Sequence, residues 1–163
     1  MFKLFNFPSK TKKRRSSPDL NFEDNDLINQ ILDNRWSMVS HAGLVATAKA
    51  VHYVIDNNIG GDFVECGVWR GGNAILAKSI IERRASQKKV WLYDTFEGMT
   101  EPGEKDVHRK TGEGALNQYI KTKTNNGSEW CYSDIEEVRN NFAQANLTSH
   151  GLRFVKGDVA KTL

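Results

Sequence analysis

The residues with the clearest potential for chemistry lie in the run GGDFVECGVWRGGN, between residues 60 and 73. Glu65, Gly67 and Gly71 form an acid-x-Gly-x-x-x-Gly pattern, in which a strand is expected to run into a glycine turn and then a helix. A carboxylate can accept hydrogen bonds from an ammonium group, while backbone N–H groups of a turn and a helix start can bind a carboxylate. The pattern therefore predicts a ligand-binding turn.

Spacing separates this turn from two related nucleotide-binding motifs. The dinucleotide fingerprint needs a second glycine that lets the backbone approach a pyrophosphate, and Trp69 stands at that position. A phosphate-binding P-loop shares the spacing of Gly67 and Gly72, but its lysine is replaced by Asn73. The remaining acid-x-Gly-x-x-x-Gly pattern suits a nucleoside that carries an amino-acid tail, and S-adenosylmethionine is such a ligand.

Two further acids follow predicted strands. Asp94 lies 29 residues after Glu65, where it is expected to accept hydrogen bonds from both ribose hydroxyls. Asp158 follows the carboxyl end of the next strand and could reach the exocyclic amine of adenine. Each acid or glycine alone could equally be structural, as a paired acid, a cap or a turn former. Their placement at the ends of three successive strands favours a cofactor site, since open α/β sheets bind ligands there.

The elements that would position these residues alternate between helix and strand. Apolar periodicity predicts helices at 21–33, 40–57, 73–85 and 133–146, and strands at 62–66, 89–93 and 152–156. Ser133 and Glu136 are expected to form a capping box, and 159–163 is expected to be a loop. The sequence thus predicts an α/β fold with a mostly parallel sheet and helices on both faces.

Residues 95–132 interrupt this regularity with glycine, proline and asparagine, over a length far beyond an ordinary connection. Long loops of this kind commonly serve as lids or binding loops. Acids and a histidine are scattered through and after it without a recognisable metal spacing, so no metal site is predicted and they are expected to be surface charges: Asp106, His108, Glu113 and Asp134.

The net charge and the cysteine content limit which other classes of protein the chain could belong to. The chain has a formal net charge of +3, of which residues 1–20 contribute +5 (six Lys and Arg against Asp19), leaving −2 for the rest. Residues 1–20 are predicted to be a disordered basic tail, with no nucleic-acid partner expected.

No signal peptide or membrane span is recognisable, so a cytoplasmic protein is expected. Cys66 and Cys131 lack CxxC partners and are expected to be small buried hydrophobes.

Four stretches, taken in order, resemble the macrocin O-methyltransferase (TylF/MycF-like) family of class I methyltransferases: GDFVECGVWRGGNAILAKSII, WLYDTFEGM, EWCYSDIEEVRNNF and FVKGDV. The likeness extends from Trp36 to Leu163. It implies a Rossmann-like fold and an S-adenosylmethionine- and magnesium-dependent O-methyltransferase acting on a sugar hydroxyl.

The resemblance also implies roles for individual residues. The first cofactor motif corresponds to Glu65, Gly67, Val68, Trp69 and Gly71, the ribose-binding acid and its neighbour to Asp94 and Thr95, and the adenine contacts to Gly157 and Asp158. Met38 matches a residue of a Thr-Met pair that touches the cofactor, with Ser37 replacing the threonine. The insertion 95–132 corresponds to a lid over the acceptor.

One departure from the family pattern concerns the metal. The family's magnesium-binding acids lie in motifs that look like LDTDWY and DDY, and these 163 residues contain neither. We therefore expect residues 21–163 to be the N-terminal part of a methyltransferase domain that is truncated after the third strand and inactive by itself. Whether the protein forms homo-oligomers is left open. Two alternatives remain at this stage: a nicotinamide-dependent Rossmann oxidoreductase, and a non-catalytic binding domain that uses its basic tail as an arm.

Overall fold

The structure is a computed structural model that describes residues 14–108, 111–125 and 127–163. The elements are α1 (Phe22–Asp33), α2 (His41–Asp56), β1 (Phe63–Cys66), α3 (Gly72–Arg83), β2 (Val90–Asp94), α4 (Leu116–Thr122), β3 (Lys123–Thr124), β4 (Gly127–Ser128), α5 (Ile135–Gln144), β5 (Leu152–Lys156) and α6 (Val159–Thr162). Among these helices, none is both long and apolar enough to cross a membrane.

The main sheet has the order β1-β2-β5, and both pairs of neighbouring strands are parallel, as the sequence predicts. In its register Glu65 lies beside Leu92, which in turn lies beside Phe154. Because the strands are parallel, their carboxyl ends meet at one edge of the sheet. The turn that follows β1, Asp94 at the end of β2 and the turn that follows β5 are therefore neighbours.

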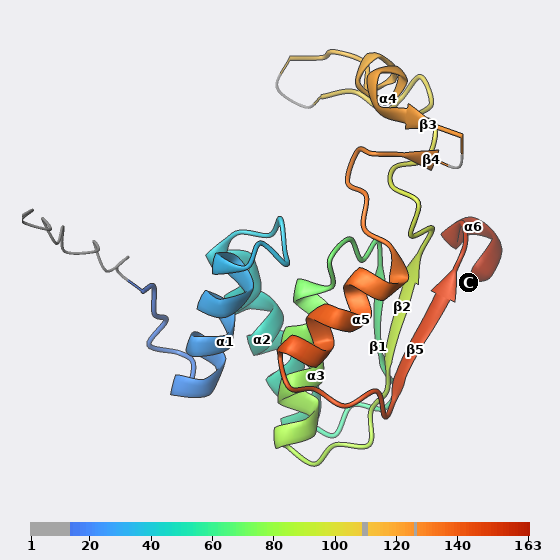
Figure 1. Cartoon of the computed structure of the whole chain (residues 1–163). Coiled ribbons are helices and arrows are strands. Elements are labelled where there is room, and N and C mark those ends of the chain that lie inside the picture. Colours follow the sequence, from blue (N-terminus) through green and yellow to red (C-terminus); the bar gives the residue numbers. More distant parts are fainter. Residues whose placement is uncertain (1–13, 109–110, 126) are drawn as a thin grey trace, which may run out of the picture.

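Helices cover one face of this sheet. Val90 and Leu92 are completely buried on that face, and the guanidinium of Arg139 in α5 lies 5.2 Å from the ring centroid of Phe154. In Figure 1 the helices α1, α2, α3 and α5 gather on one side of the strands. On the other face Val64 is 48% exposed. The helix layer predicted for this second face is not seen within the described ranges.

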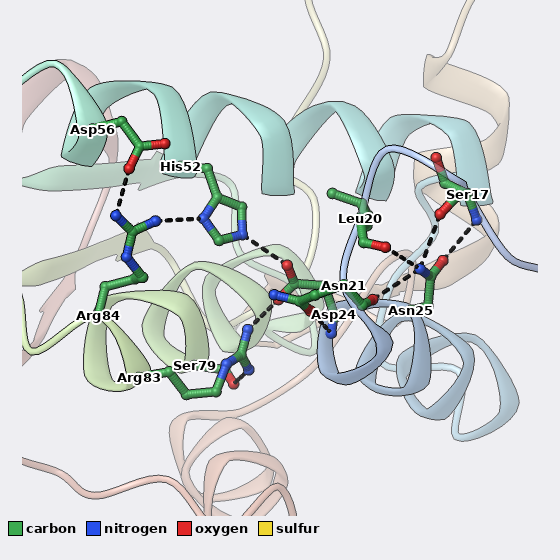
Figure 2. Close-up of polar contacts among 10 residues, drawn as sticks. All are labelled: Ser17, Leu20, Asn21, Asp24, Asn25, His52, Asp56, Ser79, Arg83 and Arg84. Carbon is green, nitrogen blue, oxygen red and sulfur yellow. Dashed lines mark hydrogen bonds and ion pairs between the residues drawn. The ribbon is translucent and has the colours of Figure 1, made fainter.

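A buried carboxylate ties α1 to α2 and α3 (Figure 2). Asp24 of α1 is completely buried, pairs with Arg83 of α3, and lies 2.7 Å from Nε2 of His52 in α2. Arg84 Nη1 lies 3.2 Å from Nδ1 of the same histidine. Since a guanidinium can only donate, Nδ1 accepts, and we assign the proton of neutral His52 to Nε2, which donates to Asp24.

Part of the predicted basic tail is ordered against α1. Within residues 14–20, the backbone N–H of Ser17 donates to Oδ1 of Asn25 (2.7 Å), and Nδ2 of Asn25 donates back to the Ser17 carbonyl (3.0 Å). The side-chain amide of Asn25 thus satisfies both polar groups of one backbone residue, which an argument from tail composition does not anticipate. Residues 1–13, the remainder of the predicted tail, lie outside the described residues.

The insertion 95–132 projects beyond the carboxyl ends of the strands and carries α4, β3 and β4 (Figure 1). Its two ends are joined at the base, where the N–H of Ser128 donates to the Glu97 carbonyl (2.9 Å) and that of Met99 to the Trp130 carbonyl (2.9 Å). A Cβ on Gly98 would lie 1.8 Å from the Ser128 carbonyl oxygen. Glycine is therefore required for this close approach of the two chain segments.

Two predictions are wrong: that Ser133 caps α5, and that residues 159–163 form a loop. Asp134, not Ser133, is the N-cap of α5, because its Oδ1 accepts from the N–H of Glu137 (2.7 Å) while Ser133 is buried. Aspartate caps a helix as well as serine does, so two adjacent candidates could not be separated by residue type. Residues 159–162, predicted as loop, form the single turn α6, with Asp158 as its N-cap.

Candidate cofactor site

A cavity of about 280 Å³ opens at the carboxyl edge of the sheet, near the lower end of the roughly 300–1,000 Å³ typical of small-molecule sites. It brings together segments that are far apart in the sequence: the chain before α2, the turns after β1 and β5, the end of β2 and both ends of the insertion. Seven of the predicted site residues line it: Met38, Gly67, Trp69, Asp94, Thr95, Gly157 and Asp158.

Three other predicted site residues lie behind this lining. Val68 is buried in the turn, and Gly71 adopts a left-handed conformation (φ +85°) as the N-cap of α3. A Cβ on Gly71 would lie 3.0 Å from Cγ1 of Val138 in α5, so the residue also permits α5 to pack closely. Glu65 stands on β1, two residues before Gly67. These three residues lie within or beside the turn, whereas Gly67 and Trp69 of the same turn line the cavity.

The turn is held by the carboxylate at the end of the next strand. Oδ2 of Asp94 accepts hydrogen bonds from the N–H groups of Val68 (2.6 Å) and Trp69 (3.2 Å). Its Oδ1 accepts from the N–H of Phe96 (2.9 Å). Trp69 has a φ of +49°, an uncommon conformation for a bulky residue, and these hydrogen bonds help to stabilise it. The turn after β1 and the loop after β2 therefore form one connected unit.

Glu65 is the most perturbed acid of the site. Burial raises the pKa of its carboxyl to about 7, and the charge of Asp94 adds to the rise, whereas hydrogen bonding from Asn73 and the Ala74 N–H opposes it. Oε1 accepts from Nδ2 of Asn73 (3.2 Å), but the buried Oε2 has no hydrogen-bond partner among the described residues. A buried acceptor without a donor beside the glycine turn fits a ligand that brings an ammonium group.

Sequence reasoning missed several residues that line the cavity: Tyr93, Gly98, Met99, Thr100, Cys131 and Val159. The first three lie inside the stretch WLYDTFEGM that carried part of the family resemblance, so that stretch held the available signal. Cys131 comes from the far end of the insertion. Its distance from Asp94 in the sequence gave no indication that the two would meet.

The prediction that both cysteines are small buried hydrophobes is wrong. Cys66 is exposed, because it lies on the face of β1 that no described helix covers. Cys131 is half-buried, and its Sγ lies 4.0 Å from Sδ of Met38 at the cavity. Burial raises the pKa of the Cys131 thiol, and the negative charge of Asp94 raises it further.

A second pocket of about 560 Å³ lies within the insertion and shares Met99 and Thr100 with the first cavity. It is lined by two acids, a histidine, an amide and an indole: Asp106, Glu113, His108, Gln118 and Trp130. Three of these residues, Asp106, His108 and Glu113, are exposed, as expected from the sequence. In the described ranges no group of three or more His, Cys, Asp or Glu side chains could hold a metal ion.

The fold and the position of the cavity define a Rossmann-like α/β protein, and comparison with a solved structure narrows this class. The O-methyltransferase NovP superimposes with a TM-score of 0.62 and 32% sequence identity, covering 78% of this chain and 49% of NovP. The fold is therefore that of a Rossmann-like methyltransferase. The family model described as Macrocin-O-methyltransferase (TylF) matches residues 9–163, and the chain belongs to this family.

Two curated O-methyltransferases resemble the chain at similar levels of sequence identity. The chain is 31% identical, over 82% of its length, to the 8-demethyl-8-(2,3-dimethoxy-alpha-L-rhamnosyl)-tetracenomycin-C 4'-O-methyltransferase of Streptomyces olivaceus. It is 34% identical, over 80% of its length, to the demethyldecarbamoylnovobiocin O-methyltransferase of Streptomyces niveus. It covers 50% of the first relative and 47% of the second, so the chain spans about half the length of the relatives it matches.

Proposed function

We propose that this chain carries the S-adenosylmethionine-binding part of an O-methyltransferase that acts on a hydroxyl of a sugar or another small molecule. The observation that carries the proposal is the buried, unpaired Oε2 of Glu65 beside a glycine turn at the carboxyl edge of the sheet. The names of the relatives agree with it, since they describe O-methyltransferases of a rhamnosyl tetracenomycin, of demethyldecarbamoylnovobiocin and of mycinamicin III.

The proposed roles combine the family resemblance with the set of residues that line or adjoin the cavity. Glu65 would accept a hydrogen bond from the ammonium of the cofactor, Asp94 and Thr95 would meet the ribose, and Gly157 and Asp158 would contact the adenine. The cofactor supplies a methyl group activated on a sulfonium. The contribution of the chain is to bind and orient, and alignment of two reactants can lower a barrier by ~7–11 kcal/mol.

The pocket within the insertion is the proposed site of the acceptor. It adjoins the cofactor cavity through Met99 and Thr100. The indole of Trp130 offers an apolar plane for the C–H face of a sugar ring, and the carboxylates of Asp106 and Glu113 can accept hydrogen bonds from hydroxyl groups. In this proposal the insertion acts as the lid that holds a glycosyl group next to the methyl donor.

Magnesium dependence is part of the proposal for the whole protein and comes from the family resemblance. The described residues offer no cluster that fits the ion, so no step is assigned to it here. Comparison of methyl transfer to a rhamnoside acceptor in magnesium and in excess EDTA tests the requirement. A cytoplasmic location and an assembly of several identical copies are likewise proposals.

Calorimetric titration of the whole protein with S-adenosylhomocysteine tests the cofactor assignment, with NADH as the matched comparison ligand. We expect S-adenosylhomocysteine to bind and to raise the melting temperature, and NADH to do neither. Binding of NADH alone would instead favour the nicotinamide-dependent oxidoreductase. Steeply salt-dependent binding of RNA or anionic lipid that is lost on deletion of residues 1–20 would favour the basic arm.

A further inference from the structure

The hydrogen bonds of Asp94 account for most of what a carboxylate can accept. Two carboxylate oxygens offer roughly four acceptor positions. The backbone N–H groups of Val68, Trp69 and Phe96 take three of them, at 2.6, 3.2 and 2.9 Å. The Thr95 hydroxyl also lies 3.4 Å from Oδ1 of Asp94. Most of the acceptor capacity of this carboxylate therefore serves the protein itself, and little is left for ligand hydroxyls while Asp94 holds the turn.

The same bonds change what the turn can bind. Backbone N–H groups of a glycine turn ahead of a helix are the groups that usually receive a phosphate. Here two of them donate to Asp94, and a phosphate brought to the turn would also meet a carboxylate charge. Glu65, two residues before Gly67, places a second acid behind the same turn.

We propose that Asp94 is a positioning residue that holds the turn after β1 in its binding conformation and excludes phosphate-bearing ligands from it. This inference rests on the proposed cofactor site and deepens it, because it says why the site takes a nucleoside without phosphate. It also assigns the carboxylate mainly to the protein backbone.

Amide hydrogen exchange of the 163-residue chain without cofactor tests the positioning role. In Asp94→Asn the amides of Val68 and Trp69 lose charge-assisted acceptors, and we expect their exchange to become ~10–100-fold faster. Asp158→Asn is the matched control, since Asp158 lines the same cavity but its Oδ1 accepts from the Ala160 N–H (3.0 Å). Unchanged exchange at both amides in Asp94→Asn, or an equal change in Asp158→Asn, would overturn the inference.

Inorganic pyrophosphate tests the exclusion role by NMR. We expect it to leave the Val68 and Trp69 amide signals of the wild-type chain in place and to shift them in Asp94→Asn. A shift in the wild type, or none in the variant, would overturn this part, and the wild-type arm stands even if the variant does not fold. Neither measurement uses S-adenosylmethionine, so failure of the positioning role can be distinguished from failure of the cofactor assignment.

Discussion

Replacement of Glu65 by glutamine should make the protein more stable at alkaline pH. Burial raises the pKa of this carboxyl from 4.5 to about 7. At 1.36 kcal/mol for each of about 2.5 pKa units, the ionised form costs the folded state about 3 kcal/mol. Below pH 4.5 the carboxyl is protonated in both states, and this cost is absent. Between pH 4.5 and 7 the unfolded chain releases the proton first, so stability falls as pH rises.

Urea unfolding of wild type and Glu65→Gln at pH 5 and pH 8, followed by tryptophan fluorescence, measures this difference. We expect the stability of the variant relative to wild type to rise by up to about 3 kcal/mol between the two pH values, since glutamine remains neutral. Glu136→Gln, at an exposed position of α5, is the control and should show no such trend. Parallel pH profiles for wild type and Glu65→Gln would refute the assignment of a buried, unpaired carboxylate.

The same variant separates stability from ligand binding. If Glu65 accepts from the ammonium of the cofactor, its ionised form is the one that binds. The affinity of the wild type for S-adenosylhomocysteine should therefore rise between pH 6 and pH 8, and Glu65→Gln should bind more weakly without that rise. Calorimetric titration at both pH values measures it. Equal affinity of the two proteins at pH 8 would place the ammonium elsewhere.

Two further substitutions probe the scaffold around the site. Asp24→Asn should lower the free energy of unfolding by about 2–3 kcal/mol, because it removes the buried charge that pairs with Arg83 and accepts from His52. Asp26→Asn, at a half-buried position of the same helix, should cost less than about 1 kcal/mol, and similar losses for the two variants in urea unfolding would contradict the buried network. Gly98→Ala should cost more than about 2 kcal/mol, because its Cβ would collide with the Ser128 carbonyl 1.8 Å away. Gly112→Ala, with a similar φ of +73° but open space around the Cβ, should cost only about 1 kcal/mol, and equal melting temperatures for the two variants would argue against the crossing at the base of the insertion.

Local patterns in the sequence were enough to predict the parallel sheet and the acids at its edge. The alternation of apolar strands and amphipathic helices determines which segments pair, because each element must bury its apolar residues. Glu65 and Asp94 could be found as candidates because Glu65 lies next to the last residue of such a strand and Asp94 ends one. Residue type and spacing at Trp69 also made a dinucleotide-binding turn less favourable, and this is a purely local property.

Tertiary structure alone decided what these residues do. The partners of Asp94 are backbone groups 25 and 26 residues away, and no pattern within either strand reveals that they meet. Cys131 reaches the cavity only because the insertion crosses itself at Gly98 and returns to the sheet. The raised pKa of Glu65 depends on its burial and on the nearby charge of Asp94, which belongs to another strand. Chemistry at the turn was encoded locally, whereas its protonation and its selectivity depend on contacts made after the chain has folded.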